Sequence, residues 1–99
     1  MKALEGIKVL DLSRVLAGPY CTMMLADFGA NIIKIEPPVV GDDSRAFGPF
    51  VGKESAYFMS LNRNKRSITM NFKREEEIDL FREMVKQADV VVENYRPGT

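Results

Sequence analysis

Two short apolar runs on either side of one amphipathic segment constrain the fold of this chain more than any other feature. Residues 7–12 (IKVLDL) and 31–36 (NIIKIE) both contain β-branched residues and are bounded by turn-forming residues. Such runs are typical of strands covered on both faces, as in parallel sheets. Two parallel strands need a long crossover, and the intervening segment is long enough to supply one. The chain therefore opens with a predicted strand–helix–strand unit.

The crossover is expected to be a helix that begins at the Gly18-Pro19 pair. Proline suits the first helical position, where the missing N–H has no partner in any case. Four apolar residues then recur at the spacing of one helical face: Cys21, Met24, Leu25 and Phe28. We expect this face to be buried, with Cys21 as an unreactive thiol inside it. Gly29 is expected to end the helix.

The rest of the chain continues the same alternation of elements. We expect an irregular loop over 39–53, a short helix or turn over 55–61, a strand over 67–72, a helix over 74–88 and a strand over 89–93. In the 74–88 helix, three glutamates occupy the positive N-terminal end, and an apolar face repeats behind them. The sequence therefore predicts a three-layer α/β fold with a mostly parallel sheet.

Composition excludes several classes of function. The 99 residues include no histidine and a single cysteine, which removes the commonest general base and metal ligand and any intrachain disulfide. Lys+Arg and Asp+Glu both number 14, so no net field recruits nucleic acid or an anionic membrane. No apolar run approaches the ~20 residues that span a bilayer. We expect a cytoplasmic protein without a metal site.

The turn SRVLAGPY follows the carboxyl end of the first predicted strand. Ligands of open α/β sheets bind outside such strand ends, and helix N-termini favour anionic groups. A dinucleotide site would need the pattern G-x-G-x-x-G here, whereas this turn has only Gly18. Glu36 does lie where a ribose-binding acid would be expected. We disfavour NAD binding on these grounds; the alternative is that Gly18-Pro19 only makes a tight turn.

One basic concentration brackets the predicted third strand: Arg63, Lys65, Arg66, Lys73 and Arg74. Tyr57 and Phe58 precede it and could flank an adenine, while the cations could pair with phosphates. From the residues alone, a solvated charged surface is the favoured interpretation. The adjacent glutamates at 75–77 argue against nucleic acid. Six carboxylates are candidate catalytic groups, and none stands out: Asp11, Asp27, Glu36, Asp42, Asp43 and Glu93.

Four stretches together resemble the N-terminal part of the class III CoA-transferases, the formyl-CoA-transferase and carnitine-CoA-transferase type, which are related to the α-methylacyl-CoA racemases. They are residues 4–38, the Gly41-Asp42 pair, residues 57–73 (YFMSLNRNKRSITMNFK) and residues 88–98 (ADVVVENYRPG). The resemblance implies a protein about four times as long, with a Rossmann-like large domain, a small domain and an interlocked homodimer. Residues 1–99 would be the N-terminal CoA-binding portion of that large domain.

The resemblance also implies the chemistry. Members transfer CoA between an acyl-CoA and a small carboxylic acid through intermediates on an aspartate, a form of covalent catalysis. Coenzyme A is then a substrate, and no bound cofactor or metal is implied. The nucleophilic aspartate would lie beyond residue 99, so we name no catalytic residue and expect the 99 residues alone to be inactive. The alternatives are a racemase-type isomerase and a non-catalytic α/β binding module.

Nine residues match the positions at which this family binds CoA. Leu16 and Ala17 correspond to residues of the first turn that line the site. A second set corresponds to the segment beside the adenine and ribose-phosphate: Met70, Asn71, Phe72 and Lys73. A third set follows the fourth predicted strand and corresponds to residues that also contact CoA: Asn94, Tyr95 and Arg96. Lys73 is the expected phosphate partner. Pro37 departs from the pattern, since formyl-CoA-transferase-type members carry a basic residue there.

Overall fold

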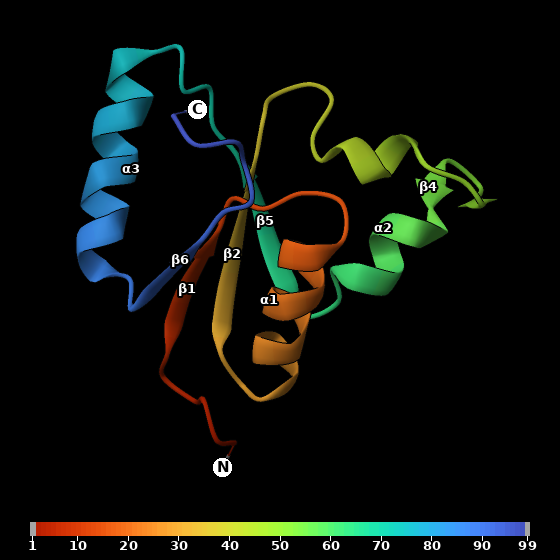
Figure 1. Ribbon diagram of the computed structural model, residues 1–99, viewed down its shortest axis with the longest axis horizontal. Coiled ribbons are helices and arrows are strands. Elements are labelled where there is room, and N and C mark those ends of the chain that lie inside the picture. The colour runs from red at the N-terminus through yellow and green to blue at the C-terminus, as the bar shows by residue number, and fades with distance from the viewer. Residues whose placement is uncertain (1, 99) are drawn as a thin grey trace.

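Four parallel strands form the central sheet of the protein (Figure 1). The computed structural model describes residues 2–98. The strands are β1 (Lys8–Asp11), β2 (Asn31–Glu36), β5 (Lys65–Thr69) and β6 (Val90–Val92), in the spatial order β5-β2-β1-β6. In this register Val9 lies beside both Ile32 and Val90, and Ile35 lies beside Ile68. All four carboxyl ends therefore meet at one edge of the sheet.

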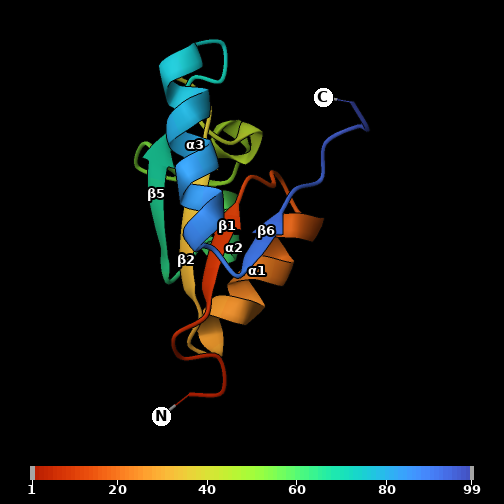
Figure 2. The same cartoon turned by 90° about the vertical axis from the view of Figure 1, so that its left-hand side faces the viewer.

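Helices cover the two faces of this sheet. Helix α1 (Ala17–Asp27) and the short α2 (Ala56–Leu61) pack on one side, and α3 (Glu75–Gln87) lies on the other (Figure 2). The predicted α/β fold, a parallel sheet flanked by helices, is confirmed. The segment expected as an irregular loop is more ordered than predicted. It contains the 3₁₀ helix η1 (Asp43–Ala46) and a small antiparallel pair, β3 (Phe50–Val51) with β4 (Glu54–Ser55).

Each face of the sheet has its own apolar cluster. Val9 and Ile32 pack against Ala26 and Ala30 on the α1 side. Leu10, Ile35 and Met70 form the second cluster, with Phe81 and Met84 of α3 packed against it. The alternation of side chains along each strand sends neighbouring residues to opposite faces, which is why Val9 and Leu10 belong to different clusters.

The predicted buried face of α1 is wrong for three of its four residues; only Leu25 is partly buried and packs against the core. The residues that pack inward are Gly18, Pro19, Thr22, Met23 and Ala26. Cys21 is exposed, and so are Met24 and Phe28, at 45% and 55%. The inward face includes small side chains that allow close approach to the sheet, and it carries Thr22, whose hydroxyl donates to Asp11 at 2.5 Å. Apolar spacing alone therefore identified a face that residues 2–98 leave mostly uncovered.

The third predicted strand, 67–72, also needs correction. Strand β5 begins two residues earlier and ends at Thr69, because Lys65 already pairs with Ile32 in the ladder. Residues 70–74 then turn toward α3. The fourth strand is β6, shorter than the predicted 89–93, and α3 lies within the predicted 74–88. The expected apolar face of α3 meets the sheet through Phe81 and Met84, with Ala88 just after the helix, whereas Val85 is exposed.

Candidate functional site

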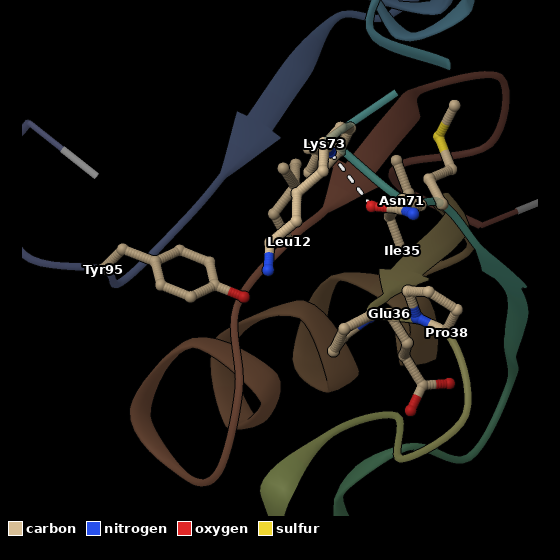
Figure 3. A pocket seen from close by; sticks show the side chains of 10 residues that line it. Leu12, Ile35, Glu36, Pro38, Asn71, Lys73 and Tyr95 are labelled. Carbon is tan, nitrogen blue, oxygen red and sulfur yellow. Dashed lines mark hydrogen bonds between the residues drawn. The ribbon is translucent and has the colours of Figure 1, made fainter. Parts of the chain in front are cut away.

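A cleft of about 420 Å³ opens at the carboxyl edge of the sheet (Figure 3). Its walls come from the ends of β1, β2 and β5 and from the segment after β6. The lining residues are Leu12, Ile35, Glu36, Pro37, Pro38, Met70, Asn71, Phe72, Lys73 and Tyr95. Residues more than 80 positions apart in the chain thus meet because parallel strands end at the same edge.

A second cleft, of about 560 Å³, adjoins the first. The two share Leu12, Phe72 and Tyr95, and the second continues along Glu93, Arg96, Pro97 and Gly98. Tyr95 therefore borders both. Ligand pockets in proteins commonly measure about 300–1,000 Å³, so each cleft is large enough for part of an extended cofactor-sized molecule.

The turn between β5 and α3 is held firmly beside the first cleft. The N–H of Lys73 donates to Asn71 Oδ1 at 3.0 Å (Figure 3). The N–H of Asn71 donates to Glu77 Oε1, also at 3.0 Å. The Phe72 ring packs edge-on against Phe81, with the centroids 5.2 Å apart. This arrangement leaves the Lys73 side chain exposed at the start of a helix, where an anionic group is favoured electrostatically.

Tyr95 is linked to the turn after β1. The Arg14 guanidinium lies 4.8 Å from the centroid of the Tyr95 ring, within cation–π range. Burial raises the pKa of Tyr95 above its ordinary value, outweighing the nearby Arg14 charge. The phenol therefore stays neutral at physiological pH and can both donate and accept a hydrogen bond.

A buried ionic network lies beneath this edge, on the α1 side. Lys34 Nζ and Asp42 Oδ2 are 2.8 Å apart, with both side chains only 1% exposed. Lys65 Nζ lies 3.2 Å from Asp11 Oδ2 in an equally buried pair. Burial lowers the pKa of Lys65, and the neighbouring Asp11 opposes that shift. For Asp42, burial alone would raise the pKa, but hydrogen bonds from Lys34 and Ser44 outweigh it and lower the pKa.

Glu36 belongs to the same network and also borders the first cleft. Burial favours the neutral acid, yet bonds from Arg45, Ser67 and the Asp42 N–H lower its pKa to about 2. Arg45 binds both carboxylate oxygens, at 2.7 and 2.9 Å. Glu36 is therefore an anion occupied by protein partners, and it is unsuited to the ribose-binding role that the sequence pattern suggested.

The predicted basic concentration does not form one surface. Arg63 pairs with Asp27, Arg66 donates to Asn31 at the amino edge of the sheet, and Lys65 is buried. Only Lys73 and Arg74 lie beyond the carboxyl end of β5. The predicted adenine-flanking aromatics are elsewhere too: Tyr57 and Phe58 line neither of the two clefts.

The structure brings together six of the nine predicted site residues. Met70, Asn71, Phe72 and Lys73 line the first cleft with Tyr95, and Arg96 lines the second. Leu16 and Ala17 are exposed at the start of α1 and line neither, while Asn94 uses its side chain on the backbone of Arg14. The sequence did not predict Leu12, Ile35 and Pro38, and it indicated Glu93 only as a candidate catalytic carboxylate. Their position at or next to predicted strand ends was the available signal.

Among residues 2–98, no three His, Cys, Asp or Glu side chains are grouped so as to hold a metal ion. Nor does any helix among those residues have the length and apolar character to cross a membrane.

Comparison with known proteins decides the family. The model of CoA-transferase family III matches residues 4–99. The chain belongs to this family. The resemblance inferred from the sequence is thereby confirmed, and the clefts lie in a family III α/β unit.

Curated relatives in this family are CoA-transferases whose names give different carboxylic acids. The chain is 54% identical to the succinyl-CoA:glutarate CoA-transferase of Homo sapiens over 99 residues, which is 99% of this chain and 23% of that protein. It is 53% identical over 94 residues to the acetyl-CoA:oxalate CoA-transferase of Acetobacter aceti, covering 95% of this chain and 24% of that protein. The chain thus spans about a quarter of the length of these relatives.

Solved structures agree with this assignment. A CAIB/BAIF family protein from Brucella suis superposes with a TM-score of 0.90 at 47% identity, covering 98% of this chain and 27% of that one. The Rv3272 protein of Mycobacterium tuberculosis gives a TM-score of 0.89 at 36% identity, with 99% and 27% covered. Both similarities extend over nearly the whole chain.

Proposed function

We propose that residues 1–99 are the N-terminal CoA-binding portion of an acyl-CoA:carboxylate CoA-transferase. The observation that carries the proposal is the pair of adjoining clefts at the carboxyl edge, formed by the segments 70–73 and 93–98 in a family III chain. The reaction exchanges one thioester for another: an acyl-CoA gives its CoA to a free carboxylate and leaves as the free acid. It needs no bound cofactor, since CoA is itself a substrate.

The chemical character of the clefts suits an acyl-CoA. Apolar and aromatic side chains such as Leu12, Met70 and Phe72 provide surfaces for an adenine ring and the pantetheine arm. Lys73 provides a cation for a phosphate, and Tyr95 provides a neutral hydroxyl. Pro37 supplies no charge, so phosphate binding rests on Lys73 and Arg96.

Transfer requires more than these residues. The nucleophilic carboxylate implied by the family resemblance would lie outside the 99 residues, and three carboxylates near the carboxyl edge are committed to other partners. Asp11, Glu36 and Asp42 are all ion-paired and buried. We therefore assign this portion to binding and orienting CoA, with covalent chemistry supplied elsewhere in the protein.

Three further features belong to the proposal. The intact protein would have a Rossmann-like large domain of which these residues form the first part. It would be an interlocked homodimer and would act in the cytoplasm. The identities of the acyl donor and the acceptor acid depend on residues outside the chain.

The direct test uses the intact protein with succinyl-CoA and a panel of small mono- and dicarboxylates, and follows the appearance of the new acyl-CoA. CoA exchange dependent on the acceptor acid is expected. Exchange of the α-proton of a 2-methylacyl-CoA without CoA transfer would instead indicate a racemase. CoA binding with neither reaction would indicate a binding module.

Lys73→Ala tests the cleft itself. Loss of a charge-assisted hydrogen bond to a phosphate should weaken CoA binding by roughly 1–3 kcal/mol, measured by calorimetric titration. Lys53→Ala is the matched control, since Lys53 is exposed and lines neither of the two clefts. Equal affinity of wild type and Lys73→Ala would contradict the placement of phosphate at this helix start.

A further inference from the structure

The turn between β1 and α1, residues 13–16, is held by side chains from three other parts of the chain. Its first residue, Ser13, donates its N–H to Asp11 Oδ1 at 2.9 Å. The carbonyl of Ser13 accepts from Lys34 Nζ at 3.0 Å. Ser13 and Lys34 are both buried, so the start of the turn is tied to β2 in a site with little access to water.

Asn94 holds the second residue of the turn. Its Oδ1 accepts from the Arg14 N–H at 3.0 Å, and its Nδ2 donates to the Arg14 carbonyl at 2.9 Å. One amide thus pairs with both backbone groups of a residue 80 positions away. The Arg14 side chain continues from there to the Tyr95 ring, which borders both clefts.

Val15, the third residue, has a φ of 68°, in the left-handed region. A β-branched residue adopts this conformation only where the surroundings impose it. The Val15 N–H points at the Asp42 carboxylate, with distances of 3.1 and 3.3 Å to its two oxygens. Asp42 is in turn fixed by Lys34 and by the N–H and hydroxyl of Ser44, both at 2.8 Å.

The Lys34–Asp42 pair therefore holds the turn at two points, the Ser13 carbonyl and the Val15 N–H. Stability alone does not account for such a pair, because removing two charges from water largely offsets their attraction. Well-packed apolar residues of similar size would stabilise the fold equally well. What apolar residues cannot do is bind individual backbone groups and hold them in one geometry.

We propose that Asp42, through Val15, and Asn94, through Arg14, are positioning residues for acyl-CoA binding. They hold the turn that leads into α1, and through its backbone they keep Arg14 against Tyr95, which borders both clefts. The inference rests on the proposed function for its ligand. Neither side chain acts on the reacting atoms; each acts through the backbone of the turn.

The test combines two measurements on the intact protein: hydrogen exchange of the peptide containing residues 13–20, and the dissociation constant of CoA. Asn94→Ala and Asp42→Asn should each speed exchange in that peptide about tenfold and weaken CoA binding about five- to tenfold. Asn94→Asp keeps the acceptor for the Arg14 N–H and should fall between Asn94→Ala and wild type. Asn31→Ala, an exposed asparagine at the opposite edge, should change neither quantity.

Faster exchange with unchanged CoA affinity in Asn94→Ala would overturn the proposal, and so would weaker binding with unchanged exchange. The latter result would mean that Asn94 contacts CoA directly. If Asp42→Asn fails to fold, the exposed Asn94 variants still decide the question. Wild-type protein that binds no CoA would overturn the proposed function and the ligand named here. The exchange measurement would then show separately whether the two side chains hold the turn.

Discussion

At the carboxyl edge, the two faces of the sheet are held by different kinds of interaction. On the α3 side, Leu10, Ile35 and Met70 make an apolar cluster. On the α1 side, the apolar pair Val9 and Ile32 gives way toward the carboxyl edge to a layer of buried charges. Both faces are covered by a helix, so burial alone does not explain the difference.

One face mainly stabilises the fold, and the other positions backbone groups. Apolar burial is non-directional, and it stabilises many similar arrangements about equally. Ion pairs and charge-assisted hydrogen bonds depend on the placement of individual atoms. The α3 face thus holds the layers together, whereas the α1 face fixes the backbone next to the candidate site. Substitutions on the two faces should therefore differ in size and in what they disturb.

The largest effect is expected from Lys34→Met. This change leaves Asp42 buried without its partner, so the free energy of unfolding should fall by about 3–5 kcal/mol. Denaturant titration of the intact protein measures it. Lys86→Met, which breaks only the exposed pair with Glu83, should cost less than about 1 kcal/mol. A similar small loss for Lys34→Met would remove the distinction between the two faces.

The second largest effect is expected from acid, which should destabilise the α1 face. Glu36 has a pKa of about 2 in the folded protein against an ordinary value of 4.5, so its stabilisation is complete above about pH 4.5. It is lost as the pH falls toward 2, by an amount on the order of 3 kcal/mol. Unfolding free energies measured from pH 6 to 2 test this. In Glu36→Gln the acid-dependent loss should shrink; an unchanged slope would assign the acid sensitivity to other carboxylates.

The smallest effect is expected on the α3 face. Ile35→Val removes one methylene group from an apolar cluster and should cost about 0.5–1.5 kcal/mol. Because the cluster is non-directional, exchange in the peptide 13–20 should stay at the wild-type rate. Denaturant titration and hydrogen exchange together measure the two quantities. Loosening of the turn in Ile35→Val would mean that the apolar face also positions it.

The residues of the candidate site were predicted from the family resemblance, which gave residues 70–73 and Tyr95 by position. The structure brings them together because parallel strands end at one edge of the sheet. The roles of the charged residues could not be predicted. Lys65 and Arg66 are adjacent in sequence, yet one is buried beside Asp11 and the other reaches Asn31 at the amino edge.

The sequence by itself determined the order of strands and helices, the parallel sheet and the family, because apolar periodicity and motif spacing are local properties of the chain. Only the tertiary structure decided which face of α1 is buried and which charges pair. It also decided that Asn94 holds Arg14 from 80 residues away. These outcomes depend on distances between segments that the fold brings together, and no periodicity encodes such distances. The turn 13–16 is thus a short stretch of sequence whose backbone is held by side chains from distant parts of the chain.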